Sequence, residues 1–276
     1  MHVMQKPFYS IIIPALNEEN YLPHLLDSLC EQSEKDFEVI VVDAKSKDLT
    51  VRVARSYDGK IPIQVMVSRD RNVSKQRNQG AWKARGEWFV FVDADTVLLP
   101  YALARLRAYI AGSDAKSLTA WGKPDSEKTE ESMHMLLYNF TLEACILLKR
   151  PMAPGPFGLV HRDAFIAVGG YLEAVQFGED QNLTQRLADA AYPLHIIRET
   201  LYIWSQRRFR TFGFFRTTRL YMTSGLRILL TKKSFGVIPE YIMGGHAYER
   251  NHKKPNRSML KKFEGNFKKL VKEFLE

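Results

Sequence analysis

Residues 87 to 100 read EWFVFVDADTVLLP, and this stretch decides the fold. Its centre, WFVFV, is a continuous apolar run of aromatic and β-branched residues, which is typical of a strand buried on both faces of a sheet. Asp93 and Asp95 follow directly, and in an extended segment both side chains face the same way. Because burying an unpaired carboxylate is costly, we interpret the two acids as candidate functional groups.

Similar runs occur upstream, SIII at 10–13 and EVIVV at 38–42, and amphipathic stretches separate them. The pattern predicts strands at 8–15, 37–44, 62–68 and 87–95, and helices at 20–32, 48–57, 74–84 and 99–110. Alternating strands and helices indicate right-handed crossovers, a parallel sheet and the α/β fold class. Farther along, we expect a long helix at 131–149, a Gly- and Pro-rich stretch of loop, short strand and short helix at 151–171, and a helix at 179–191.

Polar residues follow three of the predicted strands. Asn17 and Glu18 come after the first strand, Asp43 ends the second, and Asp93 and Asp95 end the fourth. Ligands of such sheets bind at the carboxyl ends of the strands. We therefore expect carboxylates from three separate strands to meet at one edge of the sheet.

The net charge of +9 is concentrated near the end of the chain. Residues 206–276 contain 17 Lys and Arg against 5 Asp and Glu, a net charge of +12. An anionic membrane surface, a diphosphate ligand or nucleic acid would suit this charge. Cys30 and Cys145 form no metal-binding pattern and favour a reducing compartment. No signal peptide or membrane span is recognisable, so we expect a cytoplasmic protein, with peripheral attachment at the inner face of the membrane as an option.

Asp93 and Asp95 suit a hard cation, because Mg²⁺ and Mn²⁺ commonly bind one or two carboxylates together with substrate phosphates. The same residues are also common in a simple turn at the end of a strand. A single D-x-D does not decide between these interpretations.

Five motifs occurring in order do decide. The segments SIIIPALNEE, VIVVDAKSKD, SKQRNQGAWKARGEWFVFVDADT, APGPFGLVHRDAFIAVGGY and FGEDQNLTQRL resemble those of the family 2 glycosyltransferases of the GT-A fold. The resemblance covers roughly residues 8–210. It implies a Rossmann-like nucleotide-binding sheet and an inverting, non-processive transfer of a sugar from a nucleotide diphosphate sugar to a glycan or lipid-linked acceptor. It also implies a need for Mg²⁺ or Mn²⁺.

The resemblance assigns donor-binding residues position by position. Pro14, Leu16 and Glu18 match the loop around the nucleobase, and Asp43 matches the acid that contacts the nucleoside. The other residues that match nucleotide-binding positions are Lys75, Arg77, Asp93, Arg207 and Arg208. The last two, with Gln206, fall where the family often has a flexible basic loop over the diphosphate. The growing charge of a diphosphate leaving group would be stabilised by such groups.

The resemblance also assigns the chemistry. Asp95 matches the acid that usually touches the metal, and Asp93 matches the one that faces the ribose or a metal-bound water. Asp180 matches the general base that would take the proton of the acceptor hydroxyl. Structural alternatives remain open at this point. Asp180 could simply favour a helix dipole, Arg207 and Arg208 could be a solvated face, and Asn17 with Glu18 could begin a helix.

One motif departs from the family pattern. Where D-D-G-S-x-D is common, this chain has DAKSKD, so Ala44 and Lys45 replace an acid and a glycine. Only Asp43 remains to contact the base, and the identity of the donor nucleotide stays open.

The resemblance and the charge distribution together predict the domain organisation. We expect a transferase domain at 1–210, with a nucleotide-sugar half at about 1–120 and an acceptor half at about 121–210, and a basic helical extension at 211–276. In the segment 253–276, apolar residues recur at helical spacing among lysines, which suits either an anionic membrane or the protein's own core. Nucleic acid is not expected, because the aromatic side chains are spaced for a helix rather than for base stacking.

The same motifs disfavour three other functions. A nucleotidyltransferase would usually show a Gly-rich basic loop after the first strand, where this chain has the acidic PALNEEN. A non-catalytic glycan- or lipid-binding protein with a decayed transferase fold would most plausibly have lost its acids. A dehydrogenase is disfavoured, because no G-x-G-x-x-G follows the first strand.

Overall fold

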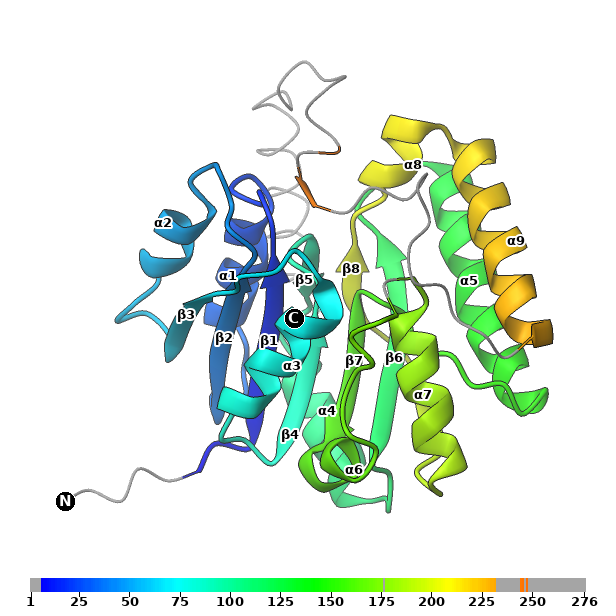
Figure 1. Ribbon diagram of the computed structural model, residues 1–276, viewed down its shortest axis with the longest axis horizontal. Coiled ribbons are helices and arrows are strands. Elements are labelled where there is room, and N and C mark those ends of the chain that lie inside the picture. The colour runs from blue at the N-terminus through cyan, green and yellow to red at the C-terminus, as the bar shows by residue number, and fades with distance from the viewer. Residues whose placement is uncertain (1–5, 176, 232–243, 246, 248–276) are drawn as a thin grey trace, which may run out of the picture.

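The computed structural model describes residues 6–175, 177–231, 244, 245 and 247. Within them the chain forms one mixed eight-stranded sheet with helices on both faces (Figure 1). The strands are β1 Tyr9–Ala15, β2 Phe37–Asp43, β3 Ile63–Val67, β4 Trp88–Val92, β5 Thr96–Leu98, β6 Ser117–Pro124, β7 Phe157–His161 and β8 Leu194–Trp204. The helices are α1 Leu22–Cys30, α2 Thr50–Arg55, α3 Val73–Lys83, α4 Ala102–Ala111, α5 Thr129–Leu147, α6 Arg162–Ala167, α7 Glu179–Asp189, α8 Arg207–Phe212 and α9 Phe214–Thr231.

The strands lie in the order β3-β2-β1-β4-β7-β6-β8-β5. The first four run parallel, as predicted. Beyond this predicted parallel part the sheet is mixed, because β7 runs antiparallel to both β4 and β6, and β5 runs antiparallel to β8. The apolar runs indicate that a strand is buried, but they carry no information on its direction, which the long-range pairing decides.

The core has two parts, one on each face of the sheet. Ile11 and Ile13 of β1 point to the side of α1 and α4, whereas Ile12 points to the side of α3. All three are fully buried, which confirms that these strands are covered on both faces. Gly80 lets α3 approach closely, since a Cβ there would lie 2.5 Å from Cγ2 of Ile12.

The strand β5 follows β4 directly in sequence but pairs with β8 at the far edge of the sheet. The sheet curls, so that β5 lies against α1 behind β1 (Figure 1). The backbone N–H of Leu98 donates to Ser28 Oγ at 3.2 Å, and Gln32 Nε2 donates to the carbonyl of Leu99 at 2.9 Å. The turn that carries Asp93 and Asp95 therefore lies where the chain leaves the middle of the sheet.

The predicted strands and helices are confirmed, whereas β5, β6 and β8 were not predicted. Among the described residues, none of the helices has both the length and the apolar character that crossing a membrane requires. Most of the predicted basic extension, including all of segment 253–276, lies outside the described residues, so its membrane or core assignment stays a prediction.

Candidate active site

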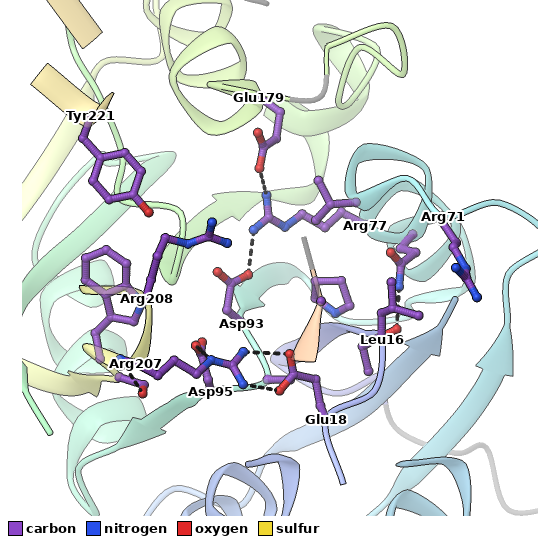
Figure 2. Close-up of a pocket in the computed structure, with 18 residues that line it drawn as sticks. Leu16, Glu18, Arg71, Arg77, Asp93, Asp95, Glu179, Arg207, Arg208 and Tyr221 are labelled. Atoms are coloured by element: carbon purple, nitrogen blue, oxygen red, sulfur yellow. Dashed lines mark hydrogen bonds and ion pairs between the residues drawn. The ribbon is translucent and has the colours of Figure 1, made fainter. Parts of the chain in front are cut away.

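A cavity of about 160 Å³ lies at the carboxyl ends of the central strands, between β1, β4 and the start of α8 (Figure 2). Its polar and charged lining residues are Glu18, Arg71, Gln76, Arg77, Asp93, Asp95, Glu179, Ser205, Arg207, Arg208 and Tyr221. Its other lining residues are Pro14, Ala15, Leu16, Val73, Ala94, Trp204 and Gly244. The cavity is thus where the sheet topology predicts a ligand site.

Arg207 joins one wall of this cavity to another. Its two terminal nitrogens donate to the carboxylate of Glu18 at 2.7 Å each, and its Nε lies 2.8 Å from Oδ2 of Asp95. All three side chains are at most 12% exposed. The loop after β1, the D-x-D turn and α8 are therefore held together by one buried guanidinium, which also stacks over the ring of Tyr21 at 4.3 Å.

Arg77 forms a second, deeper junction. Its side chain is 1% exposed and donates to Asp93 at 2.8 Å, Glu179 at 3.1 Å and Asp180 at 2.7 Å. It also donates to the carbonyl of Gly155 at 3.1 Å. A single arginine on α3 thus connects the D-x-D turn to the first turn of α7, two segments that lie far apart in sequence (Figure 2).

Burial opposes the ionisation of two carboxylates that line the cavity, Glu18 and Asp93. It raises the pKa of Glu18 to about 7, although Arg207 acts in the opposite direction. It raises the pKa of Asp93 to about 6, where Arg77 opposes the shift and the charge of Asp95 adds to it. A cation or another positive group entering the cavity would therefore favour the charged forms of these acids.

The two acids that open α7 lie in different surroundings. Glu179 lines the cavity, and burial, assisted by the charge of Asp180, raises its pKa to about 8. Asp180 lies beside it, and its Oδ1 accepts hydrogen bonds from Arg77 and from the hydroxyl of Tyr171 at 3.1 Å. Gly155 leaves room at the other oxygen, since a Cβ at this position would lie 3.1 Å from Oδ2.

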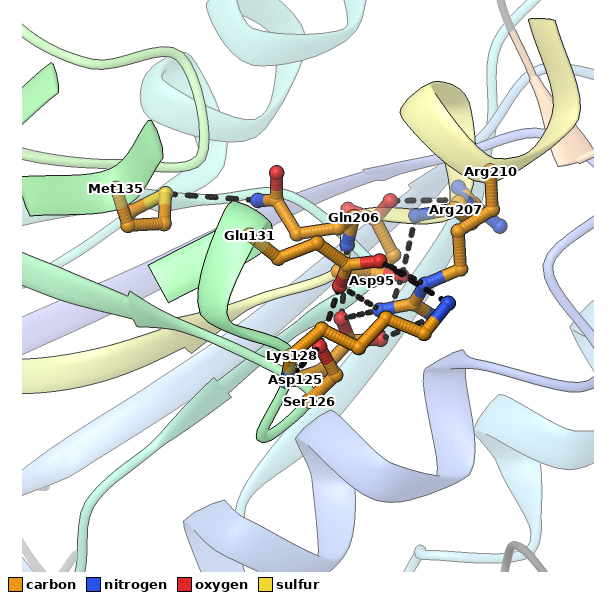
Figure 3. A network of polar contacts seen from close by, with 10 residues as sticks. Asp95, Asp125, Ser126, Lys128, Glu131, Met135, Gln206, Arg207 and Arg210 are labelled. Atoms are coloured by element: carbon orange, nitrogen blue, oxygen red, sulfur yellow. Dashed lines mark hydrogen bonds and ion pairs between the residues drawn. The ribbon is translucent and has the colours of Figure 1, made fainter. Parts of the chain in front are cut away.

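A further polar network connects α8 to the end of β6 and to α5 (Figure 3). Arg210 pairs with Asp125 after β6 and with Glu131 in the first turn of α5. Asp125 also accepts a 2.9 Å hydrogen bond from the backbone of Gln206, whose Nε2 lies 3.4 Å from Sδ of Met135. The segment that carries Arg207 and Arg208 is therefore anchored to α5.

The loops after β1 and β2 are bonded to each other. The backbone N–H of Asn17 donates to Ser46 Oγ at 2.8 Å, and that of Glu18 donates to Thr50 Oγ1 at 2.7 Å. Lys45, which stands where the family commonly has glycine, has a φ of 58°. It thus adopts the left-handed conformation that glycine reaches most easily.

The structure brings most of the predicted site residues to one cavity. These are Pro14, Leu16, Glu18, Arg77, Asp93, Asp95, Arg207 and Arg208. Lys75 is not among the lining residues, and its ammonium lies 3.0 Å from Asp70 and 3.9 Å from Glu173. Asp43 is buried beneath the loop, where Ser46 donates to it, and Asp180 lines a smaller neighbouring cavity.

Sequence reasoning missed several lining residues. Glu179 stood inside the GED motif, where only the second acid was assigned. Arg71, Trp204, Tyr221 and Gly244 belong to no recognised motif, and only the fold brings them together. Arg207 and Arg208 were expected on a flexible loop, but they lie on α8, with Arg207 buried and Arg208 pointing into the cavity (Figure 2).

A curled sheet with an acid- and arginine-lined cavity at its carboxyl edge is the architecture of the GT-A fold. The match to the family model described as glycosyl transferase family 2 covers residues 10–169, more than half of the chain. The chain belongs to this family.

Curated relatives agree with this membership. A PGL/p-HBAD biosynthesis glycosyltransferase of Mycobacterium bovis (strain BCG / Pasteur 1173P2) is 36% identical over 118 residues, 42% of this chain and 46% of that protein. The poly(ribitol-phosphate) beta-N-acetylglucosaminyltransferase TarS of Staphylococcus aureus (strain Mu50 / ATCC 700699) is 26% identical over 215 residues, 72% of this chain and 36% of TarS. The chain therefore spans about half or less of the length of these relatives.

Solved structures share the fold. Residues 1–349 of S. aureus TarS align with a TM-score of 0.58 and 22% identity, over 71% of this chain and 60% of that one. The mannosyltransferase PcManGT from Pyrobaculum calidifontis, in complex with GDP-Man and Mn²⁺, aligns with a TM-score of 0.59 and 19% identity, over 74% and 57%. At these identities the likeness is evidence of fold alone.

Proposed function

We propose that this glycosyltransferase transfers a sugar from a nucleotide diphosphate sugar to an acceptor, without processivity and with inversion at the anomeric carbon. The observation that carries the proposal is the cavity itself, in which Asp93 and Asp95 face Arg207 and Arg208 at the carboxyl ends of the strands. TarS has been crystallised with UDP and UDP-GlcNAc, and PcManGT with GDP-Man, which supports a nucleotide-sugar donor here.

The acids present fit Mg²⁺ or Mn²⁺. Arg77 bonds Oδ1 of Asp93 and Arg207 pairs with Oδ2 of Asp95, which leaves Oδ2 of Asp93 and Oδ1 of Asp95 as the candidate cation ligands. Within the described part of the chain no cluster of three or more acidic, His or Cys side chains forms a cation site. This suits a cation held by one or two carboxylates and completed by donor phosphates, where it would neutralise charge on the diphosphate.

Protein groups supply the rest of the chemistry. Arg208 and Arg71 line the cavity and carry the charge needed to bind a diphosphate and to stabilise it as it leaves. Asp180 takes the proton of the acceptor hydroxyl, and Arg77 and Tyr171 orient its carboxylate for this role. Glu179, whose pKa is raised by burial, lies beside it and lines the donor cavity.

A panel of nucleotides and nucleotide sugars, each with and without Mn²⁺, tests the proposal by thermal shift. A ligand at 100 times its dissociation constant stabilises the folded state by about 2.7 kcal/mol, which the assay resolves easily. Uridine and guanosine diphosphate sugars are compared directly, because DAKSKD leaves the base open. Stabilisation by none of them would contradict the proposal, whereas binding without any sugar transfer would favour the non-catalytic alternative.

A further inference from the structure

The helix α5 exposes a row of large apolar side chains. Six of them are between 49% and 83% exposed: Met133, Leu136, Leu137, Phe140, Leu147 and the C-cap residue Leu148. We refer to these six residues as the outer row. Successive residues of a helix are about 100° apart, so the outer row occupies about one third of the circumference. A contiguous exposed apolar surface of this kind is unusual on a protein that has no partner for it.

The opposite face of α5 is already used. Met135, Leu142 and Cys145 are buried on the side that packs against β6. Between Glu131 and Lys149 the only charged residue is Glu143, which is paired with Arg198 at 3.0 Å. The helix is therefore apolar on two opposite faces, a pattern expected of a helix covered on both faces.

Positive charge accompanies the outer row. The helix α9 lies beside α5 in Figure 1, and its residue Phe214 contacts His134 with ring centroids 5.7 Å apart. It contains Arg216, Arg219 and Arg227, all exposed, and no acidic residue. Exposed apolar side chains on α5, beside a helix that carries exposed arginines, match the chemistry of an anionic bilayer with its acyl region and its negative headgroups.

The outer row is connected to the cavity through the same helix. Glu131 and Met135 on the inner face of α5 bond Arg210 and Gln206, which flank Arg207 and Arg208 in the cavity wall (Figure 3). We infer that the outer row and the arginines of α9 dock this protein on an anionic lipid bilayer.

Vesicle co-sedimentation with the full chain tests the docking surface. The vesicles contain phosphatidylcholine with an increasing share of phosphatidylglycerol. The double variant Leu136→Gln/Leu137→Gln is compared with the control Leu49→Gln/Ile166→Gln. The control residues are similarly exposed, but Leu49 is the N-cap of α2 and Ile166 lies on α6. We expect about tenfold or greater loss of vesicle binding in the α5 pair and no change in the control. Glutamine keeps the helix intact, because its helix propensity is close to that of leucine.

Charge is tested separately. Arg216→Gln/Arg219→Gln should weaken binding severalfold at low salt and little at high salt, while Arg52→Gln/Arg55→Gln on the exposed side of α2 should have no effect. The basic segment 253–276 is identical in all these proteins, so differences between matched pairs report on the described surface alone.

Three results would overturn the inference. The wild-type protein could fail to bind anionic vesicles, or the α5 double variant could bind them as well as the control double variant does. Alternatively, sedimentation velocity could show dimers that the α5 pair dissociates, which would make the outer row an interface between copies. Donor binding is followed in parallel by thermal shift. A protein that binds vesicles but no nucleotide sugar would contradict the proposed function and leave the docking surface standing.

Discussion

The guanidinium of Arg207 donates two 2.7 Å hydrogen bonds to the carboxylate of Glu18, a residue 189 positions earlier in the chain. The two terminal nitrogens of Arg207 bond the two oxygens of Glu18, and such a bidentate pair is a strong arrangement for these groups. Nε of Arg207 also pairs with Asp95. Asp95 therefore has two roles. It pairs with Arg207 in the cavity wall, and it is also the acid proposed to bind the cation.

Replacing Arg207 should destabilise the fold. Arg207→Gln leaves Glu18 and Asp95 buried without their cation, and removing one partner of a buried pair typically costs about 3–5 kcal/mol. The double variant Glu18→Gln/Arg207→Gln should recover part of this loss. Urea unfolding measures both. Arg105→Gln, which breaks an exposed pair with Glu199, is the control and should cost less than about 1 kcal/mol. Equal losses for the two arginines would contradict the buried junction.

Donor binding should depend on a divalent cation through Asp95. Asp95→Asn should abolish most of the nucleotide diphosphate affinity that Mn²⁺ adds, because a neutral amide oxygen attracts a hard cation more weakly than a charged carboxylate does. Calorimetric titration with and without Mn²⁺ measures the difference, and the exposed Asp58→Asn serves as the control. Equal affinity with and without metal in the wild type, unchanged by the substitution, would refute this assignment.

Asp180 should act on the acceptor and not on the donor. Asp180→Asn should lower transfer to a hydroxyl acceptor by about 100-fold or more and leave nucleotide-sugar affinity nearly intact. Glu179 lines the donor cavity, so Glu179→Gln should alter donor affinity instead. Transfer rates and donor titrations on both variants separate the two roles. An acceptor phosphate is already ionised, so the test requires a hydroxyl acceptor. Full activity of Asp180→Asn on such an acceptor would eliminate it as the base.

Glu179 should make the protein less stable as the pH rises. Burial raises its pKa to about 8 in the folded state, while the unfolded chain releases this proton near pH 4.5. Between these values the folded state binds more protons, so its stability falls with increasing pH. Glu179→Gln cannot ionise and should gain in stability relative to wild type from about pH 5 to pH 8. Chemical unfolding across this range measures the gain, and a constant difference would show that Glu179 is ionised in the folded protein. Glu179→Asp retains a carboxyl and should keep the pH dependence.

The sequence predicts the first half of the sheet well, because β1, β2 and β4 are continuous apolar runs that can only be buried. The strands β6 and β8 carry polar and charged side chains such as Lys123 and Arg198, and their partners are distant in sequence. The site follows the same rule. Motifs located Asp93 and Asp95, but no local pattern indicates that Arg77 would turn inward and bond three acids. That arrangement depends on tertiary packing of α3 against α7.

The position of β5 at the edge of the sheet has a consequence for biosynthesis. Within the described part of the chain β5 pairs only with β8, and 95 residues separate the two strands. At ribosomal speeds that interval lasts roughly 5 to 20 seconds. We expect the parallel strands β1 to β4 to assemble early, while the edge residues Thr96–Leu98 wait for their partner. A nascent chain in this interval exposes an incomplete sheet edge, which makes it a substrate for chaperones and prone to aggregate if translation stalls.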